Sequence, residues 1–134
     1  MTSVALRLAR ALWAPFAVVA VHDGIARLFN HYSILDPGFH FFGGVAGAYC
    51  LSTLLRLFPS APVPSWVRTR TAVVAITFGV ALLWEGAEGA SDVFLGTHIQ
   101  EGWLDTGSDL VLGFLGAVIA ARLFFRRRRS AAAQ

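Results

Sequence analysis

The sequence contains no lysine and a single cysteine, Cys50, and both facts limit the kinds of protein that the chain can be. One cysteine excludes a disulfide within the chain, and its apolar neighbours indicate a structural thiol buried in a membrane. Only 14% of the residues are charged, whereas 56% are hydrophobic and the mean hydropathy is +0.62. Because soluble domains contain about 45–50% apolar residues, this composition indicates an integral membrane protein.

The sequence also lacks a nucleophile motif, a phosphate-cradling loop and any long polar segment that would form a soluble domain. Its 134 residues fit one transmembrane domain over residues 1–134. The formal charge of +3 with eleven arginines resembles that of nucleic-acid-binding proteins. Here, however, the arginines flank apolar runs, which is a signal of membrane topology. We therefore expect no nucleic acid as a partner.

Four apolar segments are long enough to cross a bilayer, which requires about 20 helical residues. They predict helices over about 11–29, 37–58, 66–90 and 105–125. The first segment resembles a signal peptide in its basic start and short apolar centre. Because its apolar character resumes beyond Asp23, we expect it to be retained as a helix, with Pro15 tolerated near its start.

The arginines predict the orientation of these helices. Ten of the eleven lie near the N-terminus, in the 56–70 connector or near the C-terminus. The positive-inside rule then places both termini in the cytoplasm, which requires an even number of spans. The expected fold is an all-α, polytopic four-helix transmembrane bundle in the inner (plasma) membrane, surrounded by lipid. The run Arg126–Arg129 is consistent with a stop signal at the inner face.

Helix ends and close contacts also leave local signals. Asp36 and Pro37 predict the start of the second helix, with the carboxylate as its cap and proline in the first turn. Gly43 and Gly47 form a GxxxG pattern, which allows another helix to approach closely. Asp105 or Thr106 is in position to cap the fourth helix.

Six of the eight acidic residues lie between Trp84 and Asp109. Acidic and histidine residues spaced three or four apart share one face of a helix. Such pairs are Asp36–His40, Glu85–Glu88, Glu88–Asp92 and Asp105–Asp109. Placing a carboxylate within the bilayer costs free energy, so each such residue is a candidate for a functional site.

The rise of a helix places these groups at a common depth. At 1.5 Å per residue, the polar residues of all four helices lie about 18–27 Å from an arginine of the same or adjoining segment. The hydrocarbon core is about 30 Å thick, so the polar groups converge on its outer third. The sequence predicts one shared polar site that opens outward.

We predict that this site binds a divalent metal or another cation, because carboxylate oxygens favour hard ions and imidazole extends the choice to zinc, manganese or iron. The predicted ligands are Asp36, His40, Glu85, Glu88, Asp105 and Asp109, and additional contributors are His22, Asp23 and Asp92. Alternatively, Asp23 pairs with Arg27 four residues later, and Asp92 is a solvated or capping residue. We interpret His31, His98 and Glu101 as surface loop groups.

Several segments resemble the YjdF-like bacterial inner-membrane proteins. Residues 36–44 resemble the D-x-x-x-H-F-x-x-G element of that family, and Glu85-x-x-Glu88 resembles its E-x-x-E element. Residues 94–97 resemble its F-L-G-T-Q element, and residues 105–109 resemble its D-T-x-x-D element. VanZ-like membrane proteins are more remotely similar. The resemblance implies a polytopic fold and one constellation of acids and histidine, but it implies no substrate. The chain lacks the N-terminal spans of that family, which favours a homo-oligomer or a partner in a membrane complex.

Three functions remain open from the sequence. A bound metal would activate water for hydrolysis of a lipid headgroup or phosphate ester. A proton or cation transporter would use the acids as a relay, although only Ser52, Thr53 and Thr77 offer a path through the inner half. A structural or accessory subunit of a larger membrane complex would use the polar layer for helix association. No catalytic residue is predicted.

Overall fold

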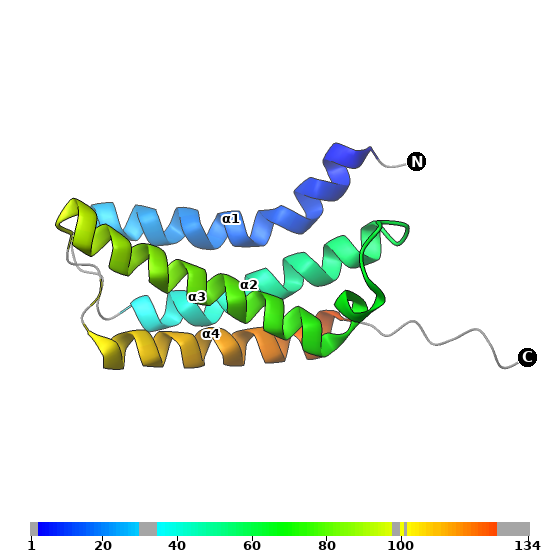
Figure 1. Cartoon of the computed structure of the whole chain (residues 1–134). Coiled ribbons are helices and arrows are strands. Elements are labelled where there is room, and N and C mark those ends of the chain that lie inside the picture. Colours follow the sequence, from blue (N-terminus) through cyan, green and yellow to red (C-terminus); the bar gives the residue numbers. More distant parts are fainter. Residues whose placement is uncertain (1–2, 30–34, 98–99, 101, 126–134) are drawn as a thin grey trace, which may run out of the picture.

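The computed structural model describes residues 3–29, 35–97, 100 and 102–125, and within them every regular element is helical (Figure 1). The elements are α1 (Val4–Phe29), α2 (Asp36–Leu57), the short 3-10 helix η1 (Ser65–Arg68), α3 (Arg70–Leu95) and α4 (Trp103–Phe124). The four long helices run alongside one another as a bundle. The predicted all-α four-helix architecture is confirmed.

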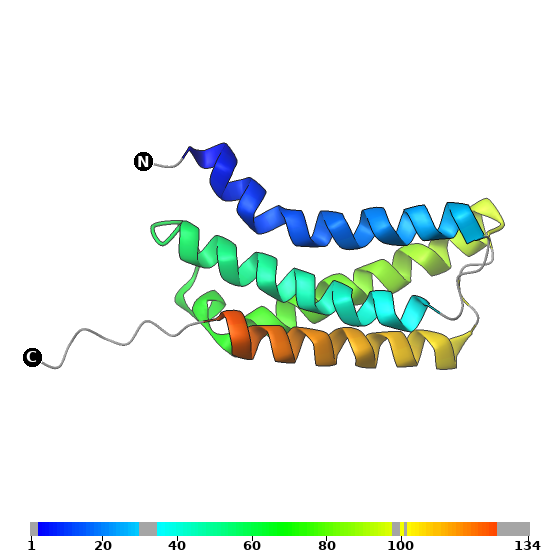
Figure 2. The ribbon, with the colours of Figure 1, turned by 180° about the vertical axis from the view of Figure 1, so that it is seen from behind.

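All four long helices are long and apolar enough to cross a membrane. Many of their large apolar side chains point outward, such as Leu28, Leu83 and Phe94 at 75–82% exposure, as expected for surfaces that contact lipid. The chain is thus a multi-pass membrane protein in contact with the bilayer. The start of α1 and the end of α4 lie at the same end of the bundle, which is also where α2 ends and α3 begins (Figures 1 and 2).

The predicted boundaries hold within two residues for α2 and α4 but not for the other two helices. α1 begins at Val4 rather than near residue 11, because the arginines before the apolar run are good helix formers. α3 covers 70–95 rather than 66–90. Thr69 is extended and its Oγ1 accepts a hydrogen bond of 3.1 Å from the Ala72 N–H, which starts the helix there. Gly96 stops it with a left-handed φ of 66°.

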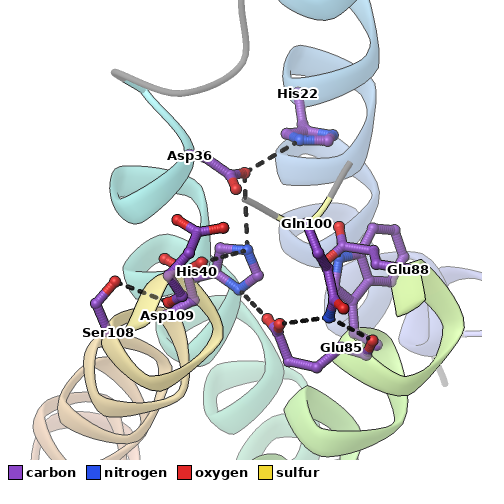
Figure 3. Close-up of polar contacts among 10 residues, drawn as sticks. His22, Asp36, His40, Glu85, Glu88, Gln100, Ser108 and Asp109 are labelled. Carbon is purple, nitrogen blue, oxygen red and sulfur yellow. Dashed lines mark hydrogen bonds and ion pairs between the residues drawn. The ribbon is translucent and has the colours of Figure 1, made fainter. Parts of the chain in front are cut away.

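Neither predicted acidic cap is present. Leu35 stands at the cap position of α2 and Gly102 at that of α4, and neither helix has a capping side chain. Asp36 is instead the first residue of α2, and its carboxylate faces two histidines (Figure 3). Pro37 does lie in the first turn, as predicted.

The closest helix pair is α2 with α4, whose backbones touch through glycines. A Cβ at Gly44 would overlap the carbonyl of Gly113, and a Cβ at Gly116 would overlap the carbonyl of Phe41. The predicted GxxxG pair is confirmed at one position only: a Cβ at Gly47 would lie 2.9 Å from Thr77 Cγ2 on α3, whereas a Cβ at Gly43 would meet nothing within 4 Å. Below this contact the core contains small side chains, namely Ala48, Val73, Ala117, Ala120 and Ala121.

α1 packs mainly against α2, and its first turns bend away from the bundle (Figure 1). Pro15 lies within α1. Proline removes the hydrogen bond to the carbonyl four residues earlier and pushes against it, which accounts for the bend. The straight remainder of α1 lies beside α2 and brings His22 to the far end of the bundle.

Candidate functional site

The centre of the polar cluster is the imidazole of His40, one turn into α2 (Figure 3). Its side chain is only 9% exposed, and its two nitrogens face different carboxylates. Nε2 lies 3.7 Å from Asp36 Oδ1 and 3.8 Å from Asp109 Oδ2. Nδ1 lies 3.3 Å from Glu85 Oε1. Residues from α2, α3 and α4 thus meet at one ring.

Backbone packing explains why Asp109 reaches this ring. A Cβ at Gly113, one turn after Asp109, would lie 3.5 Å from the backbone oxygen of His40. With the two backbones this close, short side chains suffice to bridge them. Asp109 is 2% exposed, so its carboxylate is held inside the bundle.

Two buried carboxylate oxygens receive no hydrogen bond within the described part of the chain, Glu85 Oε1 and Asp109 Oδ1. Glu85 and Asp109 are 5% and 2% exposed, respectively. A buried charged oxygen without a partner is costly unless an ion, a proton or a water satisfies it. Glu85 Oε1 has an ion-pair partner in His40 Nδ1 at 3.3 Å, so Asp109 Oδ1 is the stronger sign of a ligand at the cluster.

The first helix contributes His22, whose Nε2 lies 3.5 Å from Asp36 Oδ1. The His22 ring also packs edge-on against the Phe39 ring, with centroids 4.9 Å apart. Asp36 therefore lies between two imidazoles, one from α1 and one from α2. All four long helices supply a side chain to the same end of the bundle, as the depth argument predicted.

The connector between α3 and α4 closes over the cluster through Gln100, to which the sequence had assigned no role. Its Nε2 donates to the Glu85 backbone oxygen at 3.0 Å and to Glu85 Oε2 at 3.5 Å (Figure 3). Gly89 leaves the space for this amide, because a Cβ there would lie 2.9 Å from Gln100 Oε1. A polar residue in a connector carries no periodic signal, so only the folded chain reveals this contact.

Asp92 holds that connector and does not enter the cluster. Its Oδ1 accepts a hydrogen bond of 2.6 Å from the Thr97 hydroxyl, and its Oδ2 accepts one of 3.0 Å from the Gln100 N–H. Asp92 is thus an anchor for the connector that closes over Glu85.

We expect Asp92→Asn to loosen this connector, because an amide has one acceptor oxygen where the carboxylate uses two. Charge-assisted hydrogen bonds contribute about 1.5–3 kcal/mol, so hydrogen exchange at the Gln100 amide should accelerate about tenfold or more. Hydrogen exchange with mass spectrometry measures this. Ser91→Ala is the control, because the Ser91 hydroxyl donates a hydrogen bond to the Ala87 oxygen within its own helix. Equal exchange in all three proteins would contradict the anchoring role.

The remaining predicted residues lie outside the centre. Asp105 is half-buried one turn before Asp109, and its backbone oxygen accepts a hydrogen bond of 2.8 Å from the Ser108 hydroxyl. Asp23 is exposed on α1. The predicted Asp23–Arg27 pair and the predicted loop groups involve positions outside the described side chains, namely Arg27, His31, His98 and Glu101.

Among the residues that the structure describes, two groups of side chains could hold a metal ion, and both include His40. One is Asp36, His40 and Asp109, and the other is His40, Glu85 and Glu88. Within each group the ligand atoms lie within 4.8 Å of one another. In the second group Glu88 Oε1 already accepts a hydrogen bond of 2.7 Å from Trp84 Nε1. The first group retains the unpaired Asp109 oxygen, which makes it the better candidate.

Comparison with known families supports the membrane assignment. The sequence model of the family described as Predicted membrane protein (DUF2238) matches residues 4–130, which includes all four long helices. The chain belongs to this family. No curated protein and no solved structure matches the chain. In this DUF2238 protein, the argument for function therefore rests on the site itself.

Proposed function

We propose that this DUF2238 protein binds a divalent metal ion through Asp36, His40 and Asp109. The observation that carries the proposal is the buried Oδ1 of Asp109, which accepts no hydrogen bond from the described residues although Asp109 is 2% exposed. A divalent cation bound to this carboxylate would supply the missing partner. It would also offset the repulsion among the carboxylates that surround His40.

The two nitrogens of His40 have different roles in this proposal. Nε2 faces Asp36 and Asp109 and would bind the metal, whereas Nδ1 faces Glu85. A metal-binding histidine almost always presents its other ring nitrogen to a carboxylate or carbonyl, which fixes the orientation of the ring. Glu85 fits that role, with Gln100 holding Glu85 in turn.

His22 supports the second ligand in the same way. Its Nε2 is 3.5 Å from Asp36 Oδ1, so it restrains the orientation of this carboxylate at the first position of α2. Ligating carboxylates usually receive such support from outside the metal shell. The set of three ligands thus has a supporting group on both Asp36 and His40.

One imidazole and two carboxylates suit manganese, iron or zinc, and they leave coordination positions for water or a substrate oxygen. A metal with an open position activates a bound water and polarises a carbonyl or phosphoryl group. Hydrolysis of an ester or phosphate ester is the reaction class that this donor set supports. The arginine distribution supports an outward-facing site.

Elemental analysis of protein purified in mild detergent tests the proposal. After loading with manganese, zinc or magnesium and removal of free metal, we expect near-stoichiometric metal in the wild type. Asp109→Asn should weaken binding by more than about 100-fold, because loss of a ligand costs more than the roughly 10–100-fold that loss of a supporting group costs. Asp105→Asn is the matched control on the same helix and should retain the metal.

Two outcomes would overturn the proposal. One is wild-type protein that takes up no metal after loading, which would favour an accessory subunit or a carboxylate relay. The other is equal metal content in the wild type and Asp109→Asn, which would place the ion elsewhere. Glu85→Gln separates the roles further: a supporting residue should cost about 10–100-fold in affinity without abolishing the site.

A further inference from the structure

An apolar groove extends from the polar cluster along the bundle, between α1, α2 and α3. Its volume is about 430 Å³, and residues on α2 from Asp36 to Leu54 line it. Its polar end contains His22, Asp36 and His40, while its remaining lining is mostly aliphatic, including Val19, Leu51 and Ile76. The groove therefore joins a hydrocarbon-like wall to the proposed metal ligands.

Contacts at both ends hold α1 as one wall of this groove. At one end Trp13 Nε1 donates to the Tyr49 hydroxyl at 3.1 Å, and that hydroxyl donates to the Arg10 oxygen at 3.0 Å. At the other end His22 meets Asp36 and Phe39. Between these contacts α1 and α2 separate enough to leave the groove.

The floor of the groove is α2, where glycine keeps the space open. A Cβ at Gly43 would meet no atom within 4 Å, and Gly43 lines the groove. Its neighbour Gly44 also borders the groove, but a Cβ at Gly44 would point into the backbone of α4. Adjacent glycines on α2 thus serve different purposes, one for helix contact and one for open space.

The length and the lining of the groove indicate what could occupy it. From Asp36 to Leu54 the helical rise spans about 27 Å, which is long enough for an extended acyl chain. One end of the groove is polar and the rest is apolar, as are the headgroup and the acyl chain of a lipid. An extended hydrocarbon chain fits, and in a bilayer such chains are the surrounding solvent.

We propose that the groove binds one acyl chain of a phospholipid, with the headgroup phosphate at the end formed by Asp36 and His40. The headgroup part rests on the proposed metal, because a phosphate beside carboxylates needs a cation between them. The acyl part rests on the groove alone. The inference assigns a substrate class to the site: a membrane lipid whose phosphate oxygen completes the coordination of the metal.

The polar end must provide the selectivity of this binding. Within a bilayer an acyl chain is already in an apolar medium, so entering an apolar groove brings little hydrophobic gain. A lipid in the groove is therefore bound in preference to the surrounding bilayer only through contacts that other lipids lack. Those contacts are with the proposed metal and the side chains around it. This explains why the groove ends at the cluster rather than at an apolar surface.

A phospholipid with a photoactivatable group at the middle of one acyl chain tests the inference in nanodiscs. Peptide mass spectrometry of the wild type should place the label on groove residues such as Val19, Leu51 and Ile76. Gly43→Leu fills the groove and should reduce this labelling at least about tenfold, the direction expected when a side chain takes the place of a ligand. Gly79→Leu is the matched control, because a Cβ at Gly79 also meets nothing within 4 Å but Gly79 does not line the groove.

The same samples separate this inference from the proposed metal. If the groove is labelled but no metal is bound, the proposed acyl site stands, whereas the proposed metal site and the headgroup contact are both wrong. Bound metal with labels spread over the outer helix faces would overturn the acyl site alone. If Gly43→Leu does not fold, the wild-type label map and its competition by unlabelled phospholipid still decide the question.

Discussion

Gly44→Ala is expected to lower the free energy of unfolding by about 3 kcal/mol or more, because one methyl group at this position overlaps the carbonyl of Gly113. The two helices must move apart, since the obstacle is backbone rather than a flexible side chain. Gly116→Ala meets the carbonyl of Phe41 on the same interface and should have a similar effect. Separation of α2 from α4 also moves His40 away from Asp109, so the metal affinity should fall together with stability.

Gly43→Ala is a control one residue away with an effect of opposite sign. Alanine exceeds glycine in helix propensity by about 1 kcal/mol, and the added methyl at Gly43 meets nothing within 4 Å. The control should therefore be neutral or slightly stabilising, while Gly44→Ala lowers the thermal midpoint by about 10 °C. Thermal unfolding in one detergent measures both. Equal midpoints for the two variants would contradict the backbone contact between α2 and α4.

His40→Gln is expected to abolish metal binding, because His40 belongs to both groups that could hold an ion. A ligand at 100 times its dissociation constant stabilises the folded state by about 2.7 kcal/mol, so added metal should raise the thermal midpoint of the wild type. In His40→Gln that rise should disappear. The measurement is the metal-dependent shift itself, which separates a lost ligand from a general loss of stability.

His22→Gln provides the comparison for His40→Gln. His22 contacts the same carboxylate, Asp36, but belongs to neither group of metal ligands. Loss of a supporting group costs about 10–100-fold in affinity, so a metal-dependent shift should persist at higher metal concentration. If both histidine variants lose the shift equally, His22 is itself a ligand. If neither loses it, the ion does not bind at His40.

Much of this architecture could be predicted from hydropathy and helical rise. The four spans follow from apolar segments of sufficient length, and the convergence of His22, Asp36, His40, Glu85 and Asp109 follows from their depth along those spans. The third helix was predicted to end near residue 90, five residues too early, and its last turns contain Gly86 and Gly89. Glycine is more frequent in transmembrane helices than in soluble ones, and α3 continues through both to Leu95.

The remaining features depend on rotation about a helix axis and on loop geometry. Spacing alone does not determine which of the adjacent Gly43 and Gly44 faces α4. The same ambiguity applied to Asp105, which shares a face with Asp109 but lies in the first turn and outside both ligand groups. Gln100 could not be predicted at all, because its position depends on Asp92 holding the connector.

The glycine contact between α2 and α4 has a mechanical consequence for the cluster. His40 and Asp109 lie on two backbones in direct contact, so neither ligand can shift without straining a rigid joint. Glu85 is attached differently, because Gln100 from a connector restrains it. Bilayer tension or thinning that tilts α3 would therefore change the support of the His40 ring while leaving the distance between His40 and Asp109 unchanged. His40 and Asp109 are thus held by direct contact between two helix backbones, whereas Glu85 is held by a hydrogen bond from a connector residue.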